Sequence, residues 1–154
     1  MKIIPYHPRY KEAFIEMNKA WIEAMFVLED EDVAVLGSVE ETIAQGGQIY
    51  FALDEAGEAM ACCMIAPKRN GEWEIEKFAA RGMYTGVGAG SACLSACIEH
   101  AKRSGAEKIV IVSNRKCVHA VRLYRKFGFR EVPVDKEKFH FERADIAFER
   151  TLED

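Results

Sequence analysis

The sequence has little of what a membrane-bound, secreted or nucleic-acid-binding protein needs. None of its stretches approaches the roughly 20 apolar residues of a membrane span. The first residues, MKIIPYHPRYKEAF, lack the uninterrupted apolar run of a signal peptide. Positive charge is also in short supply, because 21 Lys and Arg residues stand against 25 Asp and Glu residues, which gives a net charge of -4. We therefore expect a cytoplasmic protein whose main partner is neither a membrane nor a nucleic acid.

The chain also lacks a cysteine pattern that would indicate disulfides or a metal site. Its cysteines are odd in number, contain no Cys-x-x-Cys spacing and are not accompanied by clustered histidines. Cys62 and Cys63 are neighbours on a predicted strand and so face opposite sides, whereas Cys93 and Cys97 share one face of a predicted helix. We predict that the cysteines are small core residues in a reducing compartment and that the protein has no metal site.

The residues that are present suit one globular domain that spans residues 1–154. Hydrophobic residues make up 49% of the chain and charged residues 30%, and there is neither an internal repeat nor a linker. Periodicity and turn signals predict strands at 2–4, 48–54, 58–67, 73–81, 107–114, 129–134 and 138–152, and helices at 7–26, within 28–47, at 88–104 and at 118–127. In the last strand the apolar residues change from odd to even positions, which indicates a bulge or a change of partner. The predicted fold class is a mixed α/β (α+β) domain in which strands outnumber helices.

Three glycines, Gly86, Gly88 and Gly90, stand at the start of the third predicted helix. Glycine lets backbone N–H groups converge on a phosphate, and a helix N-terminus adds free N–H groups and a partial positive charge. The alternative is a glycine-rich turn between a strand and a helix. The spacing fits neither a Walker A loop, because no lysine follows the last glycine, nor a Gly-x-Gly-x-x-Gly dinucleotide fingerprint.

The segment from Asn114 to Arg130 is the second unusual region, because it is basic in an acidic protein. It contains no acidic residue and carries Arg115, Lys116, Arg122, Arg125, Lys126 and Arg130. This local excess of positive charge could meet an anionic ligand, and the common alternative is a solvated helix face.

Together the two regions resemble the GNAT acyltransferase superfamily, whose members use acetyl-CoA. The family's loop, Gln/Arg-x-x-Gly-x-Gly/Ala, opens a helix after the central strand, and here it is Thr85-Gly86-Val87-Gly88-Ala89-Gly90. The family's later signature is an Asn that closes a strand, then Ala, Leu-Tyr and Gly-Phe, which here are Asn114, Ala120, Leu123-Tyr124 and Gly128-Phe129. The resemblance covers essentially the whole chain. It implies a mostly antiparallel central sheet of about six to seven strands flanked by about four helices.

The resemblance also implies a set of residues that bind acetyl-CoA as co-substrate. The backbone of Phe78, Ala79 and Ala80 is expected to pair with the pantetheine arm like an extra strand. The remaining expected contacts are Thr85, the backbone amides of Gly86, Val87, Gly88, Ala89, Gly90 and Ser91, and then Asn114, Ala120, Tyr124 and Lys126. The loop departs from the family because Thr85 stands where Arg or Gln is usual. We therefore predict weaker cofactor binding, unless Arg81 or the later basic helix compensates.

Acetyl transfer needs a neutral amine, a polarised thioester and a proton for the leaving thiolate. A lysine-like amine has a pKa of about 10.4, so a base must remove its proton at neutral pH. Glu74 and Glu76 alternate on the strand that enters the cofactor site, where a period of two places them on one face with Phe78 and Ala80. We prefer Glu76 as the base, and a solvent-facing carboxylate is the alternative for either. The backbone N–H near Phe78 could polarise the carbonyl.

Tyr124 is the predicted proton donor to the thiolate, as the resemblance implies, and a tyrosine packed on the inner face of a helix is the alternative. A cysteine nucleophile is not expected, because nothing orients a histidine toward Cys93, Cys97 or Cys117. The acceptor amine is poorly defined. The acidic run from Glu29 to Asp32 could attract a cationic amine, but we favour a solvated helix start. Phe139 and Phe141 could pack against an acceptor, form a homodimer interface or fill the core.

The sequence thus predicts an acetyl-CoA-dependent N-acetyltransferase that acts on a primary amine of a small molecule or a protein, by direct transfer in a ternary complex. One rival is a non-catalytic acetyl-CoA-binding regulatory module on the same fold, since a fold does not by itself supply turnover. Another is an unrelated phosphate-binding α/β domain with no preference for CoA.

Overall fold

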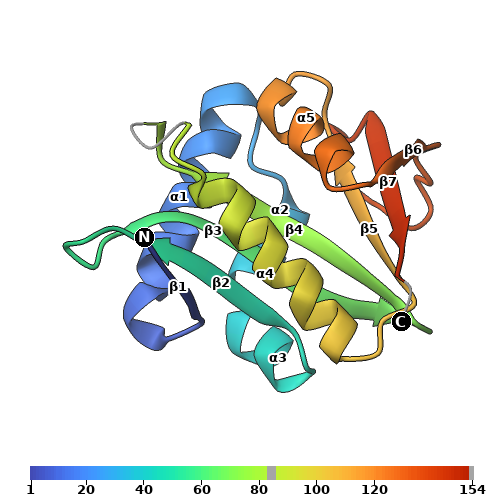
Figure 1. The fold of residues 1–154 in the computed structure, drawn as a ribbon. Helices are drawn as coiled ribbons and strands as arrows, with labels where there is room; N and C mark the ends of the chain where they lie inside the picture. The colour runs from blue at the N-terminus through green and yellow to red at the C-terminus, as the bar shows by residue number, and fades with distance from the viewer. Residues whose placement is uncertain (83–85, 153–154) are drawn as a thin grey trace.

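The computed structural model of this protein describes residues 1–82 and 86–152 (Figure 1). Its strands are β1 (Lys2–Pro5), β2 (Gln48–Leu53), β3 (Ala59–Arg69), β4 (Glu72–Ala80), β5 (Lys108–Ser113), β6 (Arg130–Val132) and β7 (Ile146–Thr151). Its α-helices are α1 (Lys11–Met25), α2 (Asp30–Leu36), α3 (Val39–Ala44), α4 (Ala89–Arg103) and α5 (Val118–Lys126), and a short 3-10 helix, η1 (Pro8–Tyr10), precedes α1. None of the helices in these two ranges is both long and apolar enough to cross a membrane.

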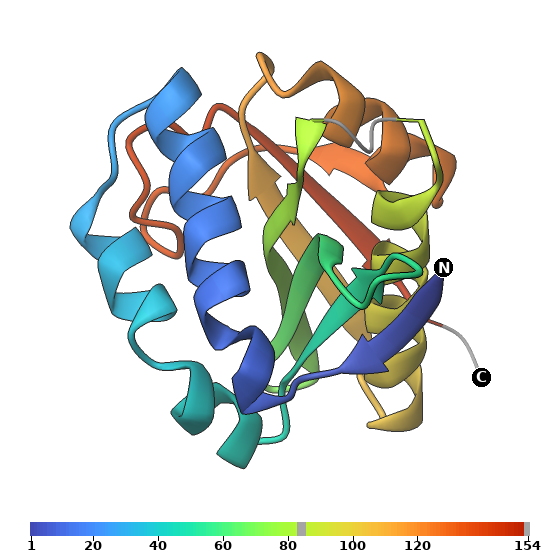
Figure 2. The same cartoon turned by 90° about the vertical axis from the view of Figure 1, so that its left-hand side faces the viewer.

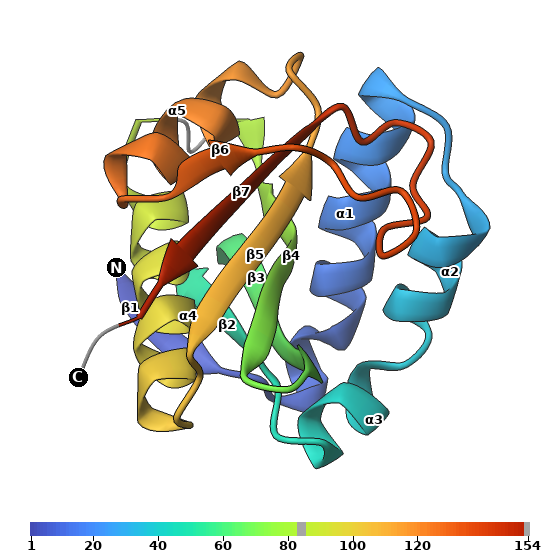
Figure 3. The same ribbon diagram turned by 90° about the vertical axis from the view of Figure 1, so that its right-hand side faces the viewer.

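The strands form one sheet in the order β1-β2-β3-β4-β5-β7-β6. Every neighbouring pair is antiparallel except β4 and β5, which run parallel. Figure 3 shows β7 alongside β5, with β6 and α5 at the same end of the sheet. The predicted mixed and mostly antiparallel sheet is confirmed.

Helices cover both faces of the sheet. Figure 2 shows α1, α2 and α3 on one side and α4 on the other. The first side packs Phe14, Met17 and Leu36 into the core, and the second packs Leu94 and Cys97. Burying side chains such as Phe14 or Leu94 contributes about 2 kcal/mol each to folding.

Four of the five cysteines lie in the core as the sequence predicted, whereas Cys117 is only partly buried. Cys62 and Cys63 are consecutive residues of β3 and belong to the cores on opposite sides of the sheet. Cys93 and Cys97 are both buried on the inner face of α4, where the Cys97 thiol donates to the carbonyl oxygen of Cys63 at 3.3 Å. All four thiols are fully or almost fully removed from solvent.

The acidic segment at 28–47 forms two short helices where one was predicted. Gly37 ends α2, and α3 begins two residues later. Glu29 and Asp32 form a capping box at the start of α2, in which each side chain accepts a hydrogen bond from the other residue's backbone N–H. This cap directs Asp32 inward, and that side chain is fully buried.

The strand predicted at 138–152 is shorter than expected. Only Ile146–Thr151 forms β7, and residues 135–145 form a loop. The Lys136 ammonium donates to the carbonyl oxygens of Phe141 at 3.0 Å and Ala144 at 2.7 Å, and so folds the loop back on itself. Phe139 is buried from this loop and not from a strand, which explains why the apolar pattern changes from odd to even positions.

Candidate functional site

The sheet opens between its two parallel strands. β4 pairs with β5 only at Glu72, Trp73 and Glu74. Beyond Glu74, β4 continues beside β3 while β5 continues beside β7. Backbone groups along the inner edges of both strands are therefore left without a strand partner at one end of the sheet, where an extended ligand could bind them.

A bulge in β4 lies at this opening. Cys62 pairs with Ala79 and Met64 with Glu76, so two residues of β4, Lys77 and Phe78, oppose a single residue of β3. Lys77 has a φ of 53°, a left-handed conformation that is uncommon for a residue other than glycine.

The bulge corrects one prediction about the strand. Glu74 and Glu76 do share a face, but Phe78 and Ala80 do not lie on it. Glu76 pairs with Met64, a residue of the core beneath α1, whereas Phe78 packs against the core beneath α4. The extra residue in the bulge reverses the alternation of side chains, which a strict period of two cannot anticipate.

A cavity of about 970 Å³ occupies the opening. Of the residues predicted for the site, those that line it are Glu74, Glu76, Phe78, Ala79, Ala80, Gly86, Gly88, Ala89, Gly90, Ser91, Asn114, Ala120, Tyr124 and Lys126. Val87 is not among the lining residues, and its side chain is exposed. Thr85 lies outside the described residues. The tertiary structure thus brings together segments that are about 50 residues apart in the chain, which is typical of a small-molecule site.

The glycines at one end of the cavity have two different roles. Gly86 and Gly88 have φ values of 86° and 82°, which favour glycine, and Gly88 is the N-cap of α4. Gly90 has no such requirement, but a Cβ atom there would lie 3.0 Å from Cζ of Phe78. Glycine at this position therefore lets the Phe78 ring lie directly against the helix.

The start of α4 offers backbone N–H groups to the cavity. The N–H of Ala92 donates to the carbonyl of Gly88 at 3.0 Å, so the three residues before Ala92 precede the first such bond of the helix. The first turn of α4 carries no acid. Unpaired N–H groups and the positive end of the helix dipole can bind an anion here.

Tyr124 lines the cavity from α5. Its ring packs against Phe78 and Phe148, with centroid distances of 6.1 and 5.6 Å. Burial raises the pKa of Tyr124 above its usual value, and Cys63 and Cys117 add smaller effects in the same direction. The phenol therefore keeps its proton at neutral pH and can donate it to an anion that forms in the cavity.

Asn114 holds the end of β5 in place. Its amide Nδ2 donates to the carbonyl oxygen of Arg143 at 2.6 Å, and its Oδ1 accepts from the N–H of Lys116 at 2.9 Å. Its side chain thus joins β5 to the loop before β7. Arg81, considered above as a compensating charge, is not among the described residues that line the cavity, and its Nε donates to the carbonyl of Ala59 at 2.9 Å.

The two glutamates of β4 have different surroundings. Glu74 is buried, and burial followed by the nearby charge of Glu76 raises its pKa well above the usual value. Glu76 forms an ion pair with Lys68, with 3.2 Å between Nζ and Oε2. Both carboxyl groups also line a smaller cavity of about 160 Å³ on the side of Lys138 and His140.

An ion cluster that the sequence did not reveal lies beside the large cavity, and two of its residues, Lys77 and Arg143, line that cavity. Both carboxylate oxygens of Asp32 accept from the guanidinium of Arg143, at 2.6 and 2.7 Å, and Oδ1 also accepts from the Lys77 ammonium at 2.7 Å. Glu29 pairs with the same guanidinium at 3.3 Å and accepts from the backbone N–H of Glu142 at 2.8 Å. We call Glu29, Asp32, Lys77 and Arg143 the ion cluster.

Burial alone would raise the pKa of Asp32, but the hydrogen bonds from Arg143 and Lys77 outweigh it and lower the pKa to about 2. Asp32 is therefore ionised and fully buried, and the predicted solvated helix start is wrong for this residue, although Asp30 and Glu31 are exposed. The sequence offered no signal, because Asp32 lies 45 residues from Lys77 and 111 from Arg143.

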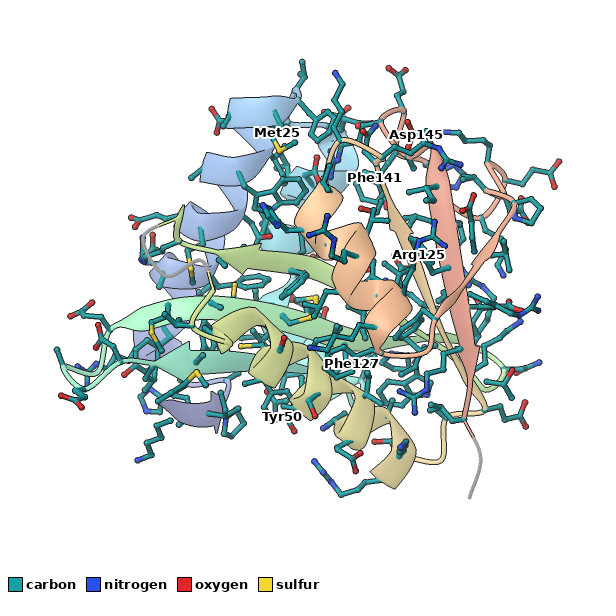
Figure 4. The ribbon with its side chains drawn as sticks, turned by 45° about the horizontal axis from the view of Figure 1, so that its top comes forward. Met25, Tyr50, Arg125, Phe127, Phe141 and Asp145 are labelled. Atoms are coloured by element: carbon teal, nitrogen blue, oxygen red, sulfur yellow. The ribbon has the colours of Figure 1, made fainter. Side chains whose placement is uncertain are left out.

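Aromatic rings surround the ion cluster. Phe141 lies between two cations, with its ring centroid 4.7 Å from Nζ of Lys77 and 4.8 Å from Cζ of Arg143. Figure 4 shows Phe141 and Met25 at the same end of the molecule, and both line the large cavity. Phe141 is thus part of the cavity wall, whereas Phe139 is buried beside the smaller cavity.

Comparisons with known proteins agree with this geometry. The family model described as the acetyltransferase (GNAT) family matches residues 5–129. A sequence comparison with curated proteins finds no match. Among solved structures, an acetyltransferase of the GNAT family from Staphylococcus aureus Mu50 superposes with a TM-score of 0.89 at 21% identity, over 99% of each chain.

Two further solved structures hold the cofactor. A protein from Salmonella typhimurium with its cofactor acetyl-CoA has a TM-score of 0.78 at 19% identity, and the match covers 100% of this chain and 95% of the other. A GNAT phosphinothricin acetyltransferase from Sinorhizobium meliloti in complex with acetyl-CoA has a TM-score of 0.77 at 18% identity, over 98% and 88%. At such identities these likenesses show a shared fold, whereas the family model spans most of the sequence. This protein therefore belongs to the GNAT acetyltransferase family.

Proposed function

We propose that residues 1–154 form one N-acetyltransferase domain that transfers the acetyl group of acetyl-CoA to a primary amine by direct transfer in a ternary complex. The observation that carries the proposal is the opening between β4 and β5, where a bulged strand edge, the N-terminus of α4 and the Tyr124 phenol all border one cavity. The fold and the family support an acyltransferase, and the nature of the acyl group and of the acceptor is the part that we propose.

The cofactor half of the cavity suits the chemical groups of acetyl-CoA. The free edge of β4 from Phe78 to Ala80 can pair with the amides of the pantetheine arm. The N–H groups at Gly88–Ser91 can hold the pyrophosphate, and Lys126 lies on the same wall with its ammonium exposed. The proposed contacts with the cofactor are thus made by backbone groups and by the ammonium of Lys126.

The transfer step requires two proton movements. The neutral amine attacks the thioester carbonyl carbon, the C–N bond forms, and the C–S bond breaks. The leaving CoA thiolate takes the phenolic proton of Tyr124, while a carboxylate takes the proton that the amine loses. Return of the amine's proton to the Tyr124 phenolate through solvent then restores the enzyme. A backbone N–H at the bulge near Phe78 would stabilise negative charge on the carbonyl oxygen.

Glu76 suits the role of base better than Glu74. The ionised form of Glu74 is disfavoured, because burial raises the pKa of this carboxyl group well above its usual value. Glu76 is ion-paired with Lys68 and lies closer along β4 to the bulge. In this proposal Glu74 is a buried neighbour of the base.

The rival is an acetyl-CoA-binding module without turnover. Calorimetric titration with acetyl-CoA, with CoA and ATP as controls, tests the cofactor, and an assay for free thiol with a panel of amines tests turnover. We expect micromolar binding that is selective over ATP, followed by thiol release that depends on an amine. Equal binding of ATP would reject the cofactor, and selective binding without any amine-dependent thiol release would favour the rival.

A further inference from the structure

The end of the cavity that lies beyond the bulge has largely apolar walls. Trp21, Met25 and Phe26 come from the end of α1, and Phe141 comes from the loop before β7. Met25 is also one of the larger apolar side chains that are exposed, which places it at the rim (Figure 4). We call this region the acceptor end, and its walls suit an acceptor with an apolar body.

The aromatic rings of the acceptor end already face cations of the protein. The guanidinium of Arg143 lies 5.8 Å from the Trp21 ring centroid as well as 4.8 Å from that of Phe141. The ammonium of Lys116 lies 6.0 Å from the ring of Phe26. An acceptor with an additional positive charge would meet these cations before it met a ring, so its binding is disfavoured.

The acids near the acceptor end are paired or buried. Asp32 and Glu29 bind the two cations of the ion cluster, so that two acids balance two bases. The carboxylate of Glu76 is paired with Lys68. The carboxyl group of Glu74 is buried, and this burial raises its pKa well above the usual value. Among the residues that the structure describes, no acid that lines this cavity is thus both exposed and unpaired, and able to attract a second cationic group of the acceptor.

Two ammonium groups that line the cavity have donors to spare. Lys77 is buried and makes one side-chain hydrogen bond, to Asp32, although an ammonium has three donors. Lys116 is exposed and has no acid within 4.0 Å in the part of the chain that the structure describes, whereas its neighbour Arg115 pairs with Glu131 at 2.9 Å. Lys116 is therefore the positive charge at the acceptor end that no acid balances.

We propose that the acceptor is a free amino acid: an amine with a carboxylate close to the reactive nitrogen and an apolar side chain. The carboxylate meets the positive charge of Lys116 and Lys77, the side chain lies against the aromatic walls, and the amine faces Glu76. This inference rests on the acetyl transfer proposed above and names the class of its acceptor. Charge complementarity of this kind selects among partners more than it adds affinity.

Matched amines test the inference. Thiol release from acetyl-CoA is measured with L-phenylalanine, L-phenylalaninamide and 2-phenylethylamine, which share the aromatic body and differ in the carboxylate. We expect kcat/KM to be roughly tenfold higher for L-phenylalanine than for either neutral-tailed analogue. The ammonium group of L-phenylalaninamide is more acidic than that of L-phenylalanine, so more of the amide is present as free amine. This difference alone would favour the amide, and it therefore cannot produce the expected preference for L-phenylalanine. Equal values, or a preference for an analogue, would overturn the inference.

Two substitutions that change the charge by the same amount test whether the preference for a carboxylate depends on Lys116. Lys116→Glu is expected to reduce the preference for L-phenylalanine over L-phenylalaninamide roughly tenfold, while the affinity for acetyl-CoA changes less. Lys19→Glu is the matched control, because Lys19 is exposed on α1 and does not line the cavity. An unchanged preference in Lys116→Glu, or an equal loss in Lys19→Glu, would overturn the assignment of the carboxylate to Lys116.

A failure of the inference about the acceptor and a failure of the proposed function would give different results. Turnover of Nα-acetyl-L-lysinamide without turnover of the three phenyl compounds would keep the transfer reaction but place the acceptor on proteins, and so overturn the amino-acid class. Selective acetyl-CoA binding without thiol release for any of the four amines would reject the transfer itself, and the acceptor class with it.

Discussion

The two halves of the large cavity are built from different parts of the polypeptide. The cofactor half is made mainly of backbone, from the free edge of β4 and the N–H groups at Gly88–Ser91. The acceptor half is made of side chains from α1, the bulge and the loop before β7, and the ion cluster links the bulge and this loop to α2. A backbone site tolerates many side-chain changes, whereas one substitution can dismantle a network of buried charges. The comparison therefore predicts that the two halves respond separately to mutation.

Asp32→Asn should have the largest effect, because it removes the shared acid of the ion cluster. Lys77 and Arg143 would then lose the acid that both of them bind, and we expect a loss of about 3–5 kcal/mol in the free energy of unfolding. Urea denaturation measures the loss. Asp30→Asn is the matched control, since Asp30 is exposed on the same turn of α2 and carries the same charge. A variant Asp32→Asn as stable as Asp30→Asn would show that the cluster contributes little.

If Asp32→Asn still folds at low temperature, it also tests whether the two halves of the cavity respond separately to mutation. Its KM for the acceptor amine should rise, because the loop that carries Phe141 is no longer held, while its affinity for acetyl-CoA should stay close to that of the wild type. Equal losses for both ligands would mean that the halves are not independent.

Tyr124→Phe removes a hydroxyl group from the wall of the large cavity. Loss of the phenolic proton should lower kcat about 100-fold, and calorimetry should find the affinity for acetyl-CoA nearly unchanged. Tyr10→Phe is the control, because the Tyr10 hydroxyl donates to the carbonyl of Gly57 at 2.9 Å, outside the cavity. Turnover equal to that of the wild type would remove Tyr124 from the mechanism.

Acid should weaken the acceptor half through Asp32. The pKa of Asp32 is lowered from 3.8 to about 2 in the folded protein. The resulting stability is therefore present above about pH 4 and is lost as the pH falls toward 2, by about 2 kcal/mol in all. Chemical denaturation from pH 6 to pH 3 should show that the difference in the free energy of unfolding between wild type and Asp32→Asn becomes smaller as the pH falls. A gap that stays constant would show that Asp32 has an ordinary pKa.

Gly88→Ala should have the smallest effect on stability, and its effect on binding should be limited to the cofactor half of the cavity. Gly88 has a φ of 82°, and an added Cβ would meet no atom within 4 Å, so the change strains only the backbone, by about 1 kcal/mol. Gly57→Ala is closely matched, with the same φ and the same open space in the β2–β3 hairpin. Both variants should lose similar stability in urea, but only Gly88→Ala should bind acetyl-CoA more weakly. Equal affinities would mean that the loop's conformation does not matter for binding.

The sequence determined the features that depend on neighbouring residues. Glycines before an amphipathic helix define the start of α4, and a four-residue spacing places Cys93 and Cys97 on one face, because both follow from local backbone geometry. The order of strands and helices, and the position of Tyr124 on α5, could be read in the same way. Two of these features, the start of α4 and Tyr124, line the cavity where we propose that the cofactor binds, which is why the sequence could predict them.

Tertiary structure alone decided the acceptor half. The bulge at Lys77 depends on how β4 pairs with β3, and no period within β4 encodes it. Asp32 resembles any acid at a helix start until folding brings it to Lys77 and to Arg143, which lies 111 residues away. The low dielectric of the interior then makes the pairing of Asp32 with Lys77 and Arg143 strong. This pairing decides which charged groups stay available to the proposed acceptor.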